Sequence, residues 1–403
     1  MKHKPIILAL STALAGAMFS GPTLATESNR PPLGLPPVPI PADNPQTPEK
    51  IALGDKLYHD TRFSADGKVS CATCHAPEKA FTDNLPVSKG FQGLTGTRNA
   101  PTVINAAYMK SQFWDGREPD LEGQAKQPPI NPVEGGLPNH EPILEIIRND
   151  RDYRKQFRKV FGTSPEHITE DHVAKAIAAF ERTVIAGNSP FDRYQYGGEE
   201  NALTDSQKRG LALFRVKARC ASCHTLEHTQ ALFTDSKFHN IGIGFKAIAG
   251  REPEIAEKFL RMKHQQADEK KALEFIDKAV LSDKEISELG RFVITEDFSD
   301  VGAFKTPTLR NVALTFPYMH DGSLQTLEDV VDFYNNGGRV NPDDPVTPFL
   351  SGGIKPLNLT EQEKADLVAF LESLTSPEIA KQAAQAKQAG IHQSASTAGG
   401  NTP

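Results

Sequence analysis

The four cysteines of the chain lie in two copies of one short pattern, in which a histidine directly follows the second cysteine. The first copy runs from Cys71 to His75 and the second from Cys220 to His224. Two thiols three residues apart share one face of a helical turn, so both can bond the edge of a porphyrin while the next imidazole reaches its iron. C-x-x-C-H is the attachment signature of c-type haem. The expected haem-binding residues are Cys71, Cys74, His75, Cys220, Cys223 and His224.

Other uses of four cysteines explain the pattern less well. Two disulfides would suit an exported chain, and a thioredoxin-like redox site also uses C-x-x-C, but neither needs a histidine after each pair. A zinc site would place its two C-x-x-C pairs about 15–20 residues apart, whereas these pairs are far apart in the chain. The sequence therefore predicts two covalent haem c groups.

Residues 1–25, MKHKPIILALSTALAGAMFSGPTLA, have the character of a secretory signal peptide. Lys2 and Lys4 precede an apolar run, and small residues lead to an expected cleavage site after Ala25. The run is short and wrongly flanked for a membrane span. We therefore expect an exported protein with no membrane span, located in the periplasm of a bacterium.

The composition is that of an ordinary globular protein. Charged residues make up 24% of the 403 positions and hydrophobic residues 38%, which suits two or three domains with real cores. The formal net charge of −6 argues against nucleic acid or an anionic membrane surface as a partner.

Two long segments of the chain match each other without a gap. APTVINAAYMKSQFWDGREPDLE and TPTLRNVALTFPYMHDGSLQTLE are related by one constant offset, which places Pro101 on Pro307 and Asn105 on Asn311. Such a repeat indicates two copies of one domain. The predicted fold is mainly α, with two cytochrome c-like haem domains related by internal duplication.

The duplication and the local composition together define the expected organisation. Residues 187–204 are rich in turn formers and form a plausible interdomain linker. The expected segments are a signal peptide at 1–25, a weakly structured proline-rich arm at 26–46, an N-terminal haem domain at 47–195, a C-terminal haem domain at 196–376 and a disordered tail at 377–403.

Several helix starts can be predicted from capping residues. Thr47 followed by Pro48 marks one. Ser282 with Glu285, and Thr360 with Glu363, have the spacing of capping boxes.

The duplication also bears on which residue lies on the face of each haem opposite its histidine. A second strong ligand to the iron on that face favours electron transfer, whereas a vacant position favours peroxide or oxygen chemistry. The constant offset places Tyr334 on Pro128. Tyrosine can ligate ferric haem and proline cannot, so we expect one closed iron and one open iron.

Alternatives to Tyr334 stay open on the residues alone. Tyr334 could be a half-buried aromatic near the end of a helix. Met319, His320 and His239 are other candidate ligands for the second iron. Between His75 and Trp114 there is no further histidine, so no loop imidazole is available there to close the first iron.

These residues match a known family. The chain resembles the bacterial dihaem cytochrome c peroxidases, and within them the MauG group, from about residue 47 to 375. The motifs that carry the resemblance are SCATCHAPEKAFTD, RNAPTVINA, QFWDGR, NPVEGG, FHNIG, TPTLRN and PYMHDG. The resemblance implies that the N-terminal haem is peroxidatic and that the C-terminal haem takes in electrons. Tyr334 at the methionine position and the missing loop histidine are MauG-like features.

The resemblance also implies roles for individual residues. Gln124 and Glu134 would line the peroxide pocket with Pro128 over the iron, and Glu134 would be the acid–base catalyst. Trp114, the single tryptophan of the chain, would relay electrons between the haems.

A calcium ion between the haems is implied as well, with Asn99 and the carbonyls of Thr315 and Pro317 as ligands. One residue departs from the MauG pattern. Where MauG has a second tryptophan, two residues before the second haem motif, this chain has Ala218. This departure counts against maturation of methylamine dehydrogenase, while peroxide chemistry is unaffected.

The expected activity is the reduction of hydrogen peroxide to water. The expected electron donor is a small exported redox protein, a cytochrome c or a cupredoxin. The alternatives are a MauG-like oxidation of residues in a substrate protein and a non-catalytic dihaem electron carrier.

Overall fold

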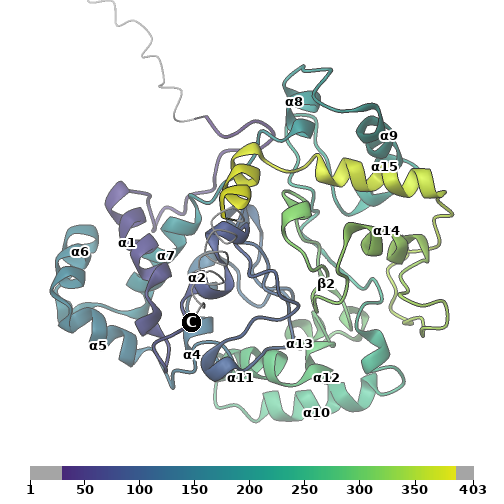
Figure 1. The fold of residues 1–403 in the computed structure, drawn as a ribbon. Helices are drawn as coiled ribbons and strands as arrows, with labels where there is room; N and C mark the ends of the chain where they lie inside the picture. The colour runs from purple at the N-terminus through teal and green to yellow at the C-terminus, as the bar shows by residue number, and fades with distance from the viewer. Residues whose placement is uncertain (1–29, 387–403) are drawn as a thin grey trace, which may run out of the picture.

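A computed structural model of the protein describes residues 30–386, which fold into a mainly helical molecule (Figure 1). The helices are α1 (Pro48–His59), α2 (Cys71–Cys74), α3 (Leu121–Gln124), α4 (Gln127–Ile130), α5 (Glu141–Asn149), α6 (Arg151–Phe161), α7 (Glu170–Glu181), α8 (Pro190–Tyr196), α9 (Asp205–Arg215), α10 (Glu252–His264), α11 (Glu269–Ser282), α12 (Lys284–Ser287), α13 (Phe292–Thr295), α14 (Leu327–Asn335) and α15 (Glu361–Glu372). Two short antiparallel strands are β1 (Phe238–His239) and β2 (Phe304–Lys305).

The same helix crossing occurs once in each half of the chain. In the first half α1 packs on α7, and in the second half α9 packs on α15 (Figure 1). A glycine lies at each contact: a Cβ atom on Gly54 would collide with the Ala176 carbonyl oxygen, and one on Gly210 would collide with the Asp366 carbonyl oxygen. The two helix pairs are therefore built alike, which agrees with the predicted duplication.

Two equivalent asparagines, Asn105 and Asn311, make equivalent backbone hydrogen bonds in the two halves of the chain. Asn105 and Asn311 both have a left-handed backbone, with φ of 64° and 61°. The Asn105 backbone N–H donates to the Val184 carbonyl at 2.9 Å, and the Asn311 backbone N–H donates to the Leu374 carbonyl at 3.1 Å. A short polar side chain tolerates this backbone conformation, so the conserved spacing of the repeat has a structural reason.

A third helical layer, formed by α10 to α13, belongs to the second half of the chain and has its own apolar core. Figure 1 shows this layer along one side of both halves. Two of its residues contact the first half directly. Thr97 Oγ1 donates to the Val280 carbonyl at 2.6 Å, and Arg98 Nε donates to Ser287 Oγ at 3.1 Å.

Two predicted helix starts are confirmed and one is wrong. Thr47 caps α1 with Pro48 at its first position, and Thr360 forms a capping box with Glu363 at the start of α15. The predicted cap Ser282 is instead the last residue of α11, because Asp283 caps α12 by accepting hydrogen bonds from two backbone N–H groups.

The proline-rich arm is not weakly structured in its described part. Tyr108 donates its hydroxyl to the Pro36 carbonyl at 2.9 Å, and Arg310 donates to the Gly34 carbonyl at 2.7 Å. Asn44 is fully buried and its amide donates to Glu122. Proline favours an extended chain, but hydrogen bonds from both halves of the protein hold this one in place.

The predicted linker and tail also differ from the expectation. Residues 187–204 include α8, whose Phe191 is buried in the core of the second half. Residues 377–386, predicted to be disordered, are helical, and Ile379 is buried in the core of the first half. The apolar Ile379 gives this segment a place to pack, and Figure 1 shows the helix beside the first half.

The predicted signal peptide, residues 1–25, lies outside the described residues. Within 30–386, no helix has both the length and the apolar character that crossing a membrane requires.

We predict that Gly210→Ala destabilises the protein by about 1–3 kcal/mol, the usual cost of overpacking, because the added methyl group would collide with the Asp366 carbonyl. Thermal unfolding of the haem-loaded protein measures the effect. Gly353→Ala is the matched control, since a Cβ atom there meets no atom within 4 Å. Equal loss of stability in both variants would contradict the proposed contact.

Candidate haem sites and active site

The first cysteine–histidine motif opens onto a cavity of about 190 Å³ in the first half of the chain. Ser70 precedes α2, so the two cysteines lie at the ends of a single helical turn, with His75 directly after it. The cavity brings together all the residues predicted to act at the N-terminal haem, and Trp114 as well: Cys71, Cys74, His75, Gln124, Pro128, Glu134 and Trp114.

The second motif opens onto a larger cavity, of about 530 Å³. It also holds the residue that departs from MauG, Ala218, which is buried. The predicted and competing site residues that line it are Cys220, Cys223, His224, Tyr334, Met319, His320, His239, Trp114, Asn99, Thr315 and Pro317.

The four cysteines and two histidines fit covalent haem. All four thiols are free. The Nδ1 atom of His224 hydrogen-bonds the Phe233 carbonyl at 2.9 Å, which leaves Nε2 available to an iron, the usual arrangement of a ligating histidine. Burial lowers the pKa of both His75 and His224, so both imidazoles are kept neutral, as a metal ligand must be.

The two cavities differ on the side opposite the histidines. In the second half α14 is one continuous helix that carries Tyr334, whereas the equivalent segment of the first half is split into α3 and α4. Pro128 and Pro129 lack the N–H groups that a continuous helix would need there. The side chain over the first cavity, at the position equivalent to Tyr334, is therefore a proline.

Tyr334 competes with two histidines that each have one ring nitrogen bound by a carboxylate, a pairing also found in metal-ligating histidines. The Tyr334 hydroxyl forms no hydrogen bond with residues 30–386. Burial raises its pKa well above the usual value, which disfavours the phenolate unless a cation such as ferric iron binds it. His320 Nε2 is held by Glu288 at 2.9 Å, and His239 Nε2 is held by Asp235 at 2.8 Å. Met319 also lines the cavity and remains an alternative.

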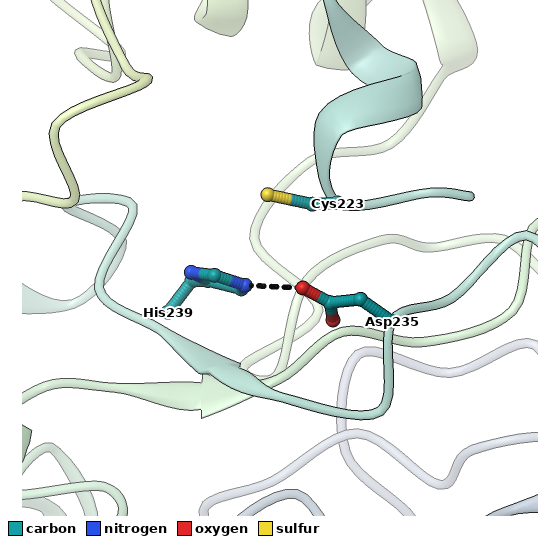
Figure 2. A group of neighbouring side chains, drawn as sticks. All are labelled: Cys223, Asp235 and His239. Carbon is teal, nitrogen blue, oxygen red and sulfur yellow. Dashed lines mark hydrogen bonds and ion pairs between the residues drawn. The ribbon is translucent and has the colours of Figure 1, made fainter.

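His239 belongs to a small group of potential metal ligands with Cys223 and Asp235. Figure 2 shows the His239 ring directed at the Asp235 carboxylate, with the Cys223 sulfur above this hydrogen-bonded pair. Cys223 and Asp235 raise the pKa of His239 to about 9. Because Cys223 is expected to bond a haem, we interpret this group as the edge of the C-terminal haem site.

Glu134 lines the first cavity as a half-buried residue whose carboxylate oxygen Oε2 is buried. Burial and the nearby Asp277 raise its pKa to about 8, against an opposing effect of Arg117. Its Oε2 atom has no hydrogen-bond partner within the described chain. Asp277 itself comes from α11 and accepts hydrogen bonds from Arg117 at 2.8 Å and Asn131 at 2.6 Å. A carboxyl group with this pKa can both accept and return a proton near neutral pH.

Sequence reasoning missed a second acid in this cavity, Glu181 of α7, which is buried. Burial raises its pKa to about 8, and its Oε2 atom also lacks a partner in the part of the chain that the structure describes. A signal was present, because Glu181 follows the buried Ile177 by four residues and so lies on the apolar face of its helix.

Trp114 lies between the two cavities and lines both. Its indole N–H donates to the Asn99 carbonyl at 2.9 Å. Its ring meets that of His320 edge to face, with centroids 6.5 Å apart. His320 is the residue equivalent to Trp114 in the repeat, so the two copies meet at this pair.

Oxygen atoms suited to calcium lie beside this pair. The amide of Asn84 donates hydrogen bonds to the carbonyls of Leu314 and Phe316. The carbonyls of Thr315 and Pro317, which alternate with them along the chain, accept no hydrogen bond from residues 30–386. Asn99 donates its Nδ2 elsewhere, at 2.9 Å, which leaves its Oδ1 atom free. Uncharged carbonyl and amide oxygens are ligands that calcium accepts.

Comparison with known proteins agrees with this geometry. A family model described as di-haem cytochrome c peroxidase matches residues 48–201. Cytochrome-c peroxidase IdrP1 of Denitromonas iodatirespirans is 38% identical over 375 residues, which cover 92% of this chain and 93% of that protein. The chain belongs to the di-haem cytochrome c peroxidase family.

This family includes proteins with different names. Methylamine utilization protein MauG of Methylorubrum extorquens is 38% identical over 337 residues, which cover 84% of this chain and 81% of that protein. The crystal structure of a MauG-like protein associated with microbial copper homeostasis has a TM-score of 0.69 and 34% identity, and the match covers 86% of this chain and 95% of that one. The di-haem peroxidase described here is thus a haem enzyme of the peroxidase type with two c-type haems.

We predict that Tyr334→Phe changes the ligation of the C-terminal haem. A tyrosinate is an anionic oxygen ligand that favours the ferric state, so its loss should remove a six-coordinate ferric signal and raise that haem's reduction potential. Electron paramagnetic resonance and a redox titration of both proteins measure this. An unchanged signal and potential would transfer the role to Met319, His320 or His239.

We also predict that Asp277→Asn shifts the pH dependence of the reaction with peroxide. Glu134 must be ionised to accept a proton, so the rate should rise with pH as its raised pKa is passed. Removing the negative charge of Asp277 lowers that pKa. The part of the pH–rate profile in which the rate rises should therefore move to lower pH. Stopped-flow rates across pH measure the shift, with the exposed Asp343→Asn as control. A rising part that stays in place would show that Asp277 does not act on Glu134.

Proposed function

We propose that this di-haem peroxidase reduces hydrogen peroxide to water at the N-terminal haem. The electrons would come from a small exported redox protein, a cytochrome c or a cupredoxin, through the C-terminal haem. The observation that carries the proposal is the first cavity, where Pro128 stands at the position equivalent to Tyr334 and the half-buried acid Glu134, with its raised pKa, lines the same space.

The chain's own residues would guide the protons. Haem iron supplies the site at which peroxide binds and is reduced. Glu134 in its ionised form would accept the proton of the peroxide oxygen nearer to the iron. It would return this proton to the oxygen farther from the iron, which leaves as water. Gln124 offers an amide to orient the peroxide. Two electrons and two protons convert each peroxide into two waters.

Electron transfer between the haems would use Trp114. This ring lines both cavities and lies against His320, so it shortens the route between them. Tyr334 would hold the C-terminal iron as an anionic ligand and favour its higher oxidation states.

We further propose one calcium ion bound by Asn99 and the carbonyls of Thr315 and Pro317, and a location in the periplasm. The free oxygen atoms beside Asn99 support the first proposal. The signal-like character of residues 1–25 supports the second. The two haem domains are proposed to divide just before α8 and not at residue 195, because Phe191 of α8 lies in the core of the second half.

Oxidation of a partner protein is the second candidate function, and the MauG-like pair of Pro128 and Tyr334 favours it. Against it stands Ala218, a small buried residue with no aromatic ring to relay electrons from the surface. Steady-state turnover of peroxide by the holoprotein, offered reduced cytochrome c or reduced cupredoxin, separates the two. Turnover with either donor supports the peroxidase, and its failure with both supports the second candidate.

We predict that Glu134→Gln slows the reaction of the diferric protein with peroxide by roughly 10²–10⁴-fold, the usual contribution of general acid–base catalysis. Both haems should remain attached, which mass spectrometry checks. Glu181→Gln makes the same change in the same cavity and should have a much smaller effect. The reverse order of the two effects would assign the proton transfer to Glu181.

A further inference from the structure

The two haem domains meet along a seam in which the duplicated segments face each other. The Asn99 backbone N–H donates to the His320 carbonyl at 2.7 Å, and the Lys305 backbone N–H donates to the Trp114 carbonyl at 2.8 Å. The offset of the repeat places Lys305 on Asn99 and His320 on Trp114. Each domain therefore contributes the same two positions, as the subunits of a symmetric dimer would.

The same offset relates the oxygen atoms beside these residues. The proposed calcium ligands are Asn99, Thr315 and Pro317, and their counterparts in the other half of the seam are Lys305, Met109 and Ser111. The ammonium group of Lys305 donates to the Ser111 carbonyl at 2.5 Å, and Ser111 is the counterpart of Pro317. The Lys305 ammonium nitrogen thus contacts the Ser111 carbonyl oxygen, and the equivalent oxygen in the other half, that of Pro317, is a proposed calcium ligand.

We propose that the Lys305 ammonium is a built-in cation that takes the place which a calcium ion occupies in the other half of the seam. The proposal rests on the calcium site proposed above. Both kinds of cation bind carbonyl oxygens, and asparagine at position 99 leaves room for a metal where lysine at position 305 supplies its own charge.

Lys305 keeps its charge at neutral pH although its surroundings disfavour it. Lys305 forms no ion pair with any carboxylate of residues 30–386, and its partly exposed side chain lines the C-terminal cavity. Burial lowers its pKa to about 8, with Asp115 acting in the opposite direction, so the ammonium persists at neutral pH. β2 fixes its backbone, because Lys305 pairs with Phe238 of β1.

A cation at this position has an evident electrostatic use. Haem carries carboxylate side chains, and both Asn99 and Lys305 line the C-terminal cavity. Positive charge there favours haem carboxylates and the reduced iron. The charge beside Asn99 would depend on the calcium concentration, whereas the charge of Lys305 would not.

The test is to give position 305 the residue found at position 99. Haem-loaded wild type and Lys305→Asn are equilibrated with calcium, freed of excess by gel filtration and analysed for metal by plasma emission. We expect Lys305→Asn to hold one calcium more per chain than wild type, because the Ser111 carbonyl and the new amide oxygen become available. Lys155→Asn, at an exposed position of α6, should show no gain.

The outcomes separate this inference from the calcium assignment. No gain in Lys305→Asn overturns the inference, whatever wild type holds. A gain together with a calcium-free wild type would overturn the assignment at Asn99 and leave the role of Lys305 standing. If Lys305→Asn does not load haem, Lys305→Asp offers a carboxylate ligand at the same place and is judged in the same way.

A second measurement tests the charge itself. Lys305→Met removes the cation without creating a ligand, so the reduction potential of the C-terminal haem should fall, and calcium should not restore it. In Lys305→Asn the potential should fall without calcium and return toward the wild-type value with calcium. A Lys305→Met protein with the wild-type potential would show that the ammonium has no electrostatic role.

Discussion

A single buried carboxylate positions the two arginines that join the first half of this protein to the third helical layer. Asp115 has no exposed surface and lies between the guanidinium groups of Arg98 and Arg117. Burial disfavours its charge, but the two arginines keep its pKa at about 2. Arg117 also reaches Asp277 of α11, so the chain from Asp115 continues into the third helical layer. Losing Asp115 would leave two buried cations without their shared partner, a cost on the order of 3–5 kcal/mol.

The functional residues are neighbours of this network in sequence and in space. Trp114 immediately precedes Asp115, and Asn99 immediately follows Arg98. Burial raises the pKa of Glu134, and Asp277, held by Arg117, raises it further. The same ion pairs therefore lie next to Trp114 and Asn99 in the chain and next to Glu134 in space.

The sequence was sufficient for the haem motifs and for the offset between the two copies, but not for every helix cap, since Asp283 and not Ser282 caps α12. The haem motifs and the contrast between Pro128 and Tyr334 needed no structure, and the two cavities bring those residues together as expected. Asp277 and Lys305 could not be foreseen, because their importance comes from partners on other elements: Arg117 for the first and Ser111 for the second. The helix at 377–386 was missed because its composition lacks a strong apolar pattern, and one isoleucine suffices to anchor it.

The mirrored hydrogen bonds of the seam have a bearing on ancestry. Contacts in which position 99 meets 320 and position 305 meets 114 are those of a homodimer whose subunits each carried one haem. Joining two such subunits in one gene would release the copies from identical selection. Each pair of equivalent positions could then specialise: tryptophan beside histidine, asparagine opposite lysine, and proline in one haem pocket where the other has tyrosine. The proposed division of labour, with peroxide reduction at one haem and electron entry at the other, is thus open to a fused chain, but not to a dimer of identical ones.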